Sequence, residues 1–416
     1  MHGISIALTL SVAAHGWGGG HQVIREQAIS HLPAWQQQLL AQADAALDRD
    51  CLALQDEHAG GKRPDLDAYC RPEGAKVSLH DINSVSATTV AMRWYLERIR
   101  EAVQAGEIDD ASRYLGVLCH WFEDIGSMSV HCTEGFIDET SLRELIPPPD
   151  EKRKRHYLYA ASGISDTGEY DLPEDDEYTP VLLGRTIDEA VLHMQRRQRL
   201  QARAARQVII PFVMDEMHGD GSTAARLRGE LVTRAAHTDS DLIFTALCLA
   251  TDRVDADTSH LDAVPLTDFV SDYRGGKSSP PWRWVPFLID ACYDQRRNVV
   301  PLQIGDGAPF ERGVGMGAPF ALRWTFGPAG AYSQFAATVG LHPDSADGTA
   351  AIFVVRVDGV EIASTEAIGA GDEPQLLEVA LPDEGDAVEL TLQTRTPADV
   401  SGSGCLAVWV NPLLLK

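Results

Sequence analysis

The sequence predicts a chain in two parts, a mainly helical domain followed by an antiparallel β-sandwich. Before about residue 275, apolar residues recur at helical spacing in several stretches. After about residue 299, short runs that alternate between apolar and polar residues are separated by clusters of glycine, proline and aspartate. Between them lies GGKSSPP (275–281), a composition typical of a loop or hinge. We therefore expect a helical domain over 17–275, a linker over 276–298 and a sandwich over 299–416.

Composition excludes several classes of function. The 416 residues carry a formal net charge of −26, which repels phosphates and argues against non-specific binding to nucleic acid or anionic membranes. We therefore expect no stable nucleic-acid partner. No apolar run reaches the roughly 18 residues that a membrane span requires, so we expect no transmembrane segment.

Residues 1–16 have the pattern of a short export signal. An apolar stretch from Ile4 to Ala14 precedes small residues at the −3 and −1 positions of a cleavage site after Gly16. Cleavage there would make Trp17 the new N-terminus and the protein secreted, periplasmic or cell-surface; the alternative is a buried first strand or helix. In an exported protein Cys51 and Cys70 would be the first candidates for a disulfide, with reduced buried thiols as the alternative.

Helical patterns follow one another along the first domain. One opens at His21, with Ile24, Ala28 and Leu32 on one face, a second follows His80, and a third runs through His120. Residues 132–185 are charged and proline-bearing, as expected of irregular chain. A capping box at Thr186–Glu189 predicts a new helix, whose arginines (RRQRLQARAARQ) we expect on a solvated face rather than in a phosphate-binding patch. A pair of helices is predicted over roughly 222–254.

The candidate chemistry centres on the segment YLGVLCHWFEDIGSMSVH (114–131). His120 and Asp124 are four residues apart, which places an imidazole and a carboxylate on the same face of a helix. His131 follows just beyond. Imidazole nitrogen and carboxylate oxygen together suit zinc, although such a pair alone is also typical of a helix-surface ion pair or a buried histidine.

With these three, the residues able to bind zinc are spread along the helical region. In chain order they are Trp17 (through a free N-terminus), His21, Asp65, His80, His120, Asp124, His131 and His156. The Trp17–His21 start, the Pro64–Asp65 turn and the YLG tripeptide before His120 resemble the zinc-dependent phospholipase C family. More distantly, they resemble the single-strand-specific zinc nucleases of the same fold. The resemblance covers about residues 17–250.

The resemblance implies two or three zinc ions. One would take Asp65, His80, His120 and Asp124. A second would take the amine and carbonyl of Trp17, His21 and the bridging carboxylate of Asp124, and a third His131, His156 and one further acid. Asp65 would also be the catalytic residue that orients or deprotonates the attacking water. The chain departs from the family at the third site, where Ala160 stands in place of the expected acid.

The function implied is a secreted zinc-dependent phosphodiester hydrolase of the phospholipase C type, in which a zinc-bound hydroxide attacks the phosphate ester of a phospholipid. A zinc-dependent nuclease of the same fold is the first alternative. The second is a non-catalytic cell-surface glycan-binding protein whose helical domain keeps a structural metal.

Residues 299–416 resemble the NPCBM family, a galactose-binding-like β-sandwich proposed to bind carbohydrate, through segments such as FERGVGMGAPFALRWTF (310–326) and CLAVWVNPLLL (405–415). The resemblance implies a carbohydrate ligand for this module. Gly313, Gly315 and Gly317 are expected in a sharp turn before the next strand, and Asp358-Gly359 in a hairpin turn. Trp324 and Trp409 could stack on a sugar, but their alternating neighbours favour the sandwich core.

Overall fold

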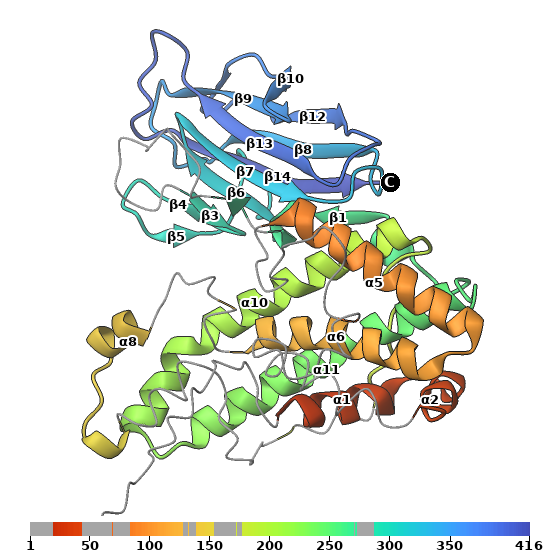
Figure 1. Ribbon diagram of the computed structural model, residues 1–416. Helices are drawn as coiled ribbons and strands as arrows, with labels where there is room; N and C mark the ends of the chain where they lie inside the picture. The colour runs from red at the N-terminus through yellow and green to blue at the C-terminus, as the bar shows by residue number, and fades with distance from the viewer. Residues whose placement is uncertain are drawn as a thin grey trace, which may run out of the picture. The chain divides into compact units, whose positions relative to one another are not determined.

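The computed structural model describes residues 20–43, 69, 84–127, 132, 139–153, 172, 177–269, 271–272 and 287–416. A helical region is followed by antiparallel β-sheets, as the sequence predicts (Figure 1). The chain divides into two compact units. Unit 1 comprises residues 1–81, 98–180 and 201–251, and unit 2 comprises 82–97, 181–200 and 252–416.

Unit 1 is helical. Its helices are α1 (Gly20–His31), α2 (Ala34–Leu40), α6 (Ile108–Gly126), α8 (Glu139–Leu145) and α11 (Ser222–Ala250), together with the later parts of α5 (Val85–Ala105) and α10 (Ile187–His218). The predicted apolar stripe of α1 is confirmed, because Ile24 and Ala28 are fully buried. Helices α1, α6 and α11 contact one another (Figure 1). The space between them is therefore shared by three distant parts of the chain. Within the described residues, no helix combines the length and apolar character of a membrane span.

Two helical predictions were wrong. Residues 222–250 form one continuous helix, α11, rather than a helix pair. The arginines of α10 do not all lie on a solvated face, since Arg199 is 3% exposed and Arg196 donates to Asp268 at 2.8 and 2.6 Å. Their partners are supplied by the loops and strands of unit 2, which helical periodicity alone does not reveal. The cap at the start of α10 does form, as the amide of Glu189 donates to the Thr186 hydroxyl at 3.2 Å.

Unit 2 contains two antiparallel sheets of six strands. One has the order β12-β8-β14-β6-β3, with β1 also paired to β14, and the other has the order β10-β9-β13-β7-β2, with β11 paired to β9. The first sheet comprises β1 (Ala263–Pro265), β3 (Phe287–Ile289), β6 (Gly313–Gly317), β8 (Gln334–Leu341), β12 (Gln375–Ala380) and β14 (Leu406–Leu415). The second comprises β2 (Ser271–Asp272), β7 (Phe320–Phe326), β9 (Ala350–Val357), β10 (Val360–Ser364), β11 (Ile368–Gly369) and β13 (Val388–Arg395). A separate pair, β4 (Cys292–Tyr293) and β5 (Val299–Val300), completes the described strands. The expected start of the sandwich was residue 299, and the sheets also take strands from 263–289.

The inward faces of both sheets form one apolar core. Every second residue of β7 is buried, the alternation that the sequence shows. Trp324 and Trp409 are both fully buried in this core, which confirms the core interpretation and removes them as sugar-stacking residues. The Asp358-Gly359 hairpin turn is also confirmed, because both residues have positive φ and join β9 to β10.

The three glycines before β7 have a different role from the one predicted. They lie on strand β6, and the turn falls at residues 318–319. A Cβ atom on Gly315 would lie 2.5 Å from the Ala291 carbonyl oxygen, and one on Gly313 would lie 2.2 Å from the Trp409 carbonyl oxygen. These glycines therefore allow neighbouring backbone to approach the strand closely.

Candidate metal centre

Two successive acidic residues on α6 are completely buried. Glu123 and Asp124 are both 0% exposed, and they lie on a helix whose other residues from Leu115 to Gly126 are buried as well. A carboxylate in such surroundings is costly unless charged or hydrogen-bonding groups surround it. These groups come chiefly from α1, the helix next to α6 in unit 1.

Asp124 lies between two imidazoles. One carboxylate oxygen is 3.4 Å from Nε2 of His21, and the other is 3.3 Å from Nε2 of His120. The two histidines are 1% and 3% exposed, and their rings stack with centroids 4.4 Å apart and an interplanar angle of 22°. The spacing of His120 and Asp124 on one helix was predicted, whereas the approach of His21 depends on the packing of α1 against α6.

The donor atoms around Asp124 fit zinc. Two ligands of a tetrahedral zinc ion, each about 2.1 Å from the metal, lie roughly 3.4 Å apart. Both Asp124–histidine distances match this spacing, and each involves a different carboxylate oxygen. Asp124, His21 and His120 would thus offer a zinc ion the carboxylate and imidazole donors that it prefers.

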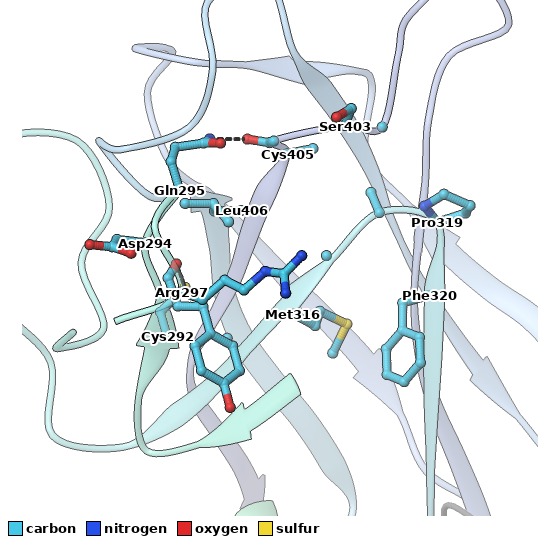
Figure 2. Close-up of a pocket in the computed structure, with 16 residues that line it drawn as sticks. Cys292, Asp294, Gln295, Arg297, Met316, Pro319, Phe320, Ser403, Cys405 and Leu406 are labelled. Carbon is cyan, nitrogen blue, oxygen red and sulfur yellow. Dashed lines mark hydrogen bonds between the residues drawn. The ribbon is translucent and has the colours of Figure 1, made fainter. Parts of the chain in front are cut away.

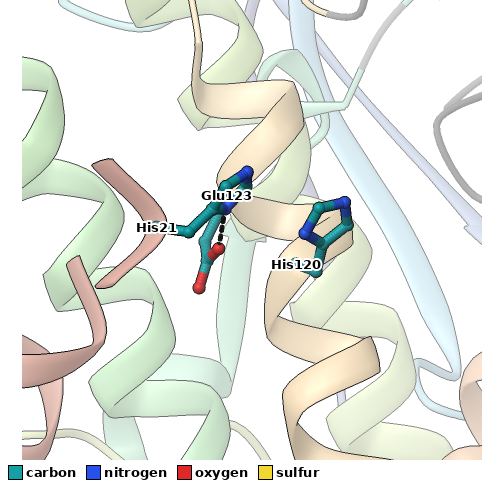
Figure 3. A group of neighbouring side chains, drawn as sticks. All are labelled: His21, His120 and Glu123. Atoms are coloured by element: carbon teal, nitrogen blue, oxygen red, sulfur yellow. Dashed lines mark hydrogen bonds and ion pairs between the residues drawn. The ribbon is translucent and has the colours of Figure 1, made fainter. Parts of the chain in front are cut away.

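Glu123 contacts the opposite edge of the His21 ring. Its Oε2 accepts a short hydrogen bond from Nδ1 of His21 (Figure 3). Both of its oxygens also accept from Arg25, Oε1 from Nε at 2.8 Å and Oε2 from Nη2 at 3.1 Å. Donor atoms of His21, His120 and Glu123 lie within 4.8 Å of one another, so Glu123 could be taken for a metal ligand. Its engagement by Arg25 favours a supporting role instead.

The electrostatics follow from burial and these contacts. Burial lowers the pKa of His21, but the carboxylates of Glu123 and Asp124 outweigh it and raise the pKa to about 9. The pKa of His120 is lowered, chiefly by burial. Burial would raise the pKa of Glu123, yet Arg25 and His21 hold it well below its usual range. For Asp239 on α11, burial and the nearby charge of Glu123 raise the pKa well above its usual value.

The structure brings together His21, His120 and Asp124 out of the eight predicted zinc ligands. The other five, Trp17, Asp65, His80, His131 and His156, lie outside the described residues, as do the predicted export signal and the Cys51–Cys70 pair. Sequence reasoning missed Glu123, Arg25 and Asp239. The only signal for them was the spacing of four residues between His21 and Arg25, which places both on one face of α1.

A separate pocket of about 560 Å³ lies in unit 2, between the loop after β4 and the segments around β6 and the start of β14 (Figure 2). Met316, Phe320 and Leu406 give it apolar walls, and Arg297 extends across it. The Gln295 amide donates to the carbonyl oxygens of Asp344 and Gly404 at 2.9 and 2.7 Å. These bonds fasten the loop on one side of the pocket to the segment on the other side.

The comparisons with known proteins concern this second unit. Residues 267–415 match the family model of the NPCBM/NEW2 domain. The C-terminal region is therefore an NPCBM module. This confirms the resemblance drawn from residues 299–416, and the match begins 32 residues earlier. No curated protein matches the chain in sequence.

Several solved structures are similar to part of the chain. CBM51 from Clostridium perfringens GH95, in complex with methyl-galactose, is 15% identical with a TM-score of 0.30. The match covers 36% of this chain and 99% of the CBM51 chain. The tandem CBM51 modules of the family 98 glycoside hydrolase from Streptococcus pneumoniae SP3-BS71 are 16% identical with a TM-score of 0.29, covering 37% of this chain and 47% of theirs. At such identities and TM-scores we infer nothing from them about function.

All residues that line the unit 2 pocket fall inside the NPCBM module, since the pocket is built from residues 292–406 and the match spans 267–415. Because Trp324 and Trp409 are buried in the core, any ligand of the NPCBM module has to be bound by other side chains. The pocket combines apolar walls with polar side chains, the composition usual for small-molecule sites.

Proposed function

We propose that the chain is a zinc-dependent phosphodiester hydrolase joined to a carbohydrate-binding module. The observation that carries the proposal is the carboxylate of Asp124, which presents one oxygen to His21 and the other to His120 at distances that suit zinc. Two metal ions held close together can stabilise both the attacking and the leaving oxygens in displacement at phosphorus. A shared carboxylate is a direct way to hold them at such a spacing.

The remaining ligands are proposed from the family resemblance. Asp65 and His80 would complete the zinc ion that His120 binds, and the free N-terminus of Trp17 would complete the ion that His21 binds. His131 and His156 would hold a third ion, for which the sequence does not single out an acid. Their histidine and carboxylate donors are of the type that zinc prefers.

Each side chain has a separate task in this proposal. When bound, zinc supplies a Lewis acid that activates water near neutral pH and offsets the charge of the phosphate. Asp124, His21 and His120 hold fixed positions because all three are buried in packed helices. Asp65 would accept the proton of the attacking water, the role that the family resemblance gives it.

The finer assignment is a secreted enzyme of the phospholipase C type that acts on a phospholipid. A zinc nuclease of the same fold is the alternative. The net charge of −26 favours the lipid substrate, because a polynucleotide approaching the chain meets repulsion along its whole length. Export is supported by the signal-like pattern of residues 1–16.

Zinc content and turnover test the proposal together. We expect the protein processed at Trp17 to contain at least two zinc ions by elemental analysis and to hydrolyse bis(p-nitrophenyl) phosphate. Activity should be lost on chelation and restored by zinc. A protein that retains fewer than two ions, or that turns over no phosphodiester when zinc is bound, would contradict it. Comparing phosphatidylcholine vesicles with single-stranded DNA as substrates distinguishes a phospholipase C from a nuclease.

Carbohydrate binding by the NPCBM module is a second proposed function, favoured by the family match over 267–415. We place the ligand in the unit 2 pocket, where Met316 and Phe320 offer apolar contact to a sugar ring and Arg297 offers hydrogen-bond donors. If this were the only function, the chain would be a glycan-binding protein in which the helical unit keeps a structural metal.

Titration of the whole protein with methyl galactoside and with N-acetylglucosamine, followed by NMR, tests this assignment. Arg297→Ala should weaken binding at least several-fold. Glu366→Ala, an exposed change outside the pocket, is the matched control and should bind normally. Unchanged binding in Arg297→Ala would remove the pocket from the proposal.

A further inference from the structure

The buried ion pair of Arg25 and Glu123 has no place in the ligand set above, yet it lies against the proposed site. Both side chains are 0% exposed. Breaking such a pair is costly, because one charge is left buried without its partner. Two hydrogen bonds, from Nε and from Nη2 of Arg25, fix the plane of the Glu123 carboxylate. Arg25 thus fixes the orientation of the Glu123 carboxylate.

His21 receives a carboxylate at each ring nitrogen. Glu123 accepts from Nδ1, whereas Asp124 faces Nε2 at 3.4 Å. The two nitrogens of a neutral imidazole have opposite roles, since one carries the proton and the other carries the lone pair that binds a metal. A carboxylate on Nδ1 keeps the proton there, so a bound metal ion would take the lone pair of Nε2, next to Asp124.

We propose that Glu123, held by Arg25, is a positioning residue that fixes the ring orientation and tautomer of His21 so that Nε2 is presented for zinc beside Asp124. The inference rests on the proposed zinc site and deepens it. Arg25 and His21 lie one turn apart on α1, and Glu123 and Asp124 are neighbours on α6. One contact between two helices thus supplies the proposed ligand pair and the pair that orients it.

The test measures zinc affinity in competition with a chelator of known affinity. In Glu123→Gln the amide oxygen can still accept from Nδ1 but the charge is lost, and we expect the ion bound by His21 to be held about tenfold more weakly. Loss of such supporting partners typically reduces metal affinity by about 10- to 100-fold. Glu216→Gln is the matched control, because Glu216 pairs with Arg228 at 3.0 Å in the same unit. The control should bind zinc as the unchanged protein does.

A second variant covers the risk that Glu123→Gln does not fold. The double change Arg25→Met with Glu123→Met removes both charges together, so neither is left buried alone. We expect it to unfold cooperatively and to hold the same ion about 100-fold more weakly, near the upper end of that range. Imidazole ¹⁵N NMR of the zinc-loaded protein adds a readout independent of affinity. It should show the proton of His21 on Nδ1 in the unchanged protein and a mixed or altered state in the double variant.

The outcomes separate the two proposals. If the unchanged protein binds no zinc, the proposed function fails. If the unchanged protein binds zinc and both Glu123 variants bind it equally well, only the positioning role is overturned. Loss of folding in both variants would also overturn it, since Arg25 and Glu123 would then be structural residues.

Discussion

The imidazole ring of His21 stacks on that of His120, with centroids 4.4 Å apart, although the two residues are 99 positions apart in the sequence. Two buried histidinium ions so close together would repel each other, and burial penalises both. The pKa of His21 is raised by its two carboxylate neighbours while that of His120 is lowered, and zinc would offset the negative charge of Asp124 between them. This relationship underlies the following predictions.

Replacing Asp124 by asparagine should abolish most phosphodiesterase activity. The amide offers only one oxygen, so it cannot serve both ions in the same way, and we expect activity to fall by more than about 100-fold, beyond the usual effect of losing a supporting residue. Zinc content should fall in parallel. Near-normal activity with a full zinc content in this variant would refute the bridging role of Asp124.

Extra residues ahead of Trp17 should weaken the ion that His21 binds. The family resemblance gives this ion the free amine and carbonyl of Trp17, and a peptide bond at that amine removes its lone pair. Proteins that begin at Trp17 and at Gly-Ser-Trp17 can be compared by elemental analysis after dialysis. We expect one ion fewer in the extended protein, and equal zinc content would show that the terminus is no ligand.

Asp239 should tolerate replacement by asparagine but not by alanine. Burial and Glu123 raise the pKa of Asp239 well above its usual value, which favours the neutral carboxyl, a group that can donate to Glu123. Asparagine keeps a neutral donor, whereas alanine leaves the Glu123 lone pair unmatched, at a cost of about 1 to 3 kcal/mol in the free energy of unfolding. Urea unfolding of the two variants measures this difference. Equal destabilisation would mean that Asp239 does not act as a donor.

Unit 2 should lose stability in mild acid because of His193, which is buried on α10. The Tyr332 hydroxyl donates to the Leu261 carbonyl oxygen at 2.8 Å, so Nε2 of His193, 3.0 Å from that hydroxyl, must be the donor to it. Burial, with smaller contributions from Arg196 and Lys416, lowers the pKa of His193 well below its usual value. The unfolded chain therefore binds a proton that the folded chain does not. The free energy of unfolding decreases for this reason as pH falls below about 6.5.

Denaturant unfolding of the whole protein between pH 5 and 8 checks this prediction, with fluorescence as the probe. His193→Gln keeps an amide nitrogen that can donate to Tyr332 and does not titrate, so its stability should vary less with pH than that of the unchanged protein. An identical pH dependence in both would assign the effect to other groups.

Much of the sandwich could be predicted from the sequence, because its strands alternate between core and solvent. The strands β7 and β8 coincide with two such alternating runs in the sequence, FALRWTF (320–326) and QFAATVGL (334–341). The glycines of β6 could not be interpreted in this way. Their role depends on the Ala291 and Trp409 carbonyls that approach them, and these come from distant parts of the chain.

The candidate site was predictable only in part. The spacing of His120 and Asp124 follows from helical geometry, and the family resemblance added His21. Nothing in the local sequence indicated that Glu123 would accept from His21 and Arg25, because that contact exists only when α1 packs on α6. In the same way, the half-buried Arg196 of α10 depends on its partner Asp268, which helical periodicity does not reveal.

The most direct test of the account is a crystal structure of the protein processed at Trp17 and loaded with zinc, with anomalous diffraction recorded on both sides of the zinc absorption edge. We predict two anomalous peaks in contact with Asp124, one also bound by His21 and the other by His120. A zinc-loaded crystal with no peak at Asp124, or with a single ion bound only by Glu123 and the histidines, would contradict the proposed bridging site.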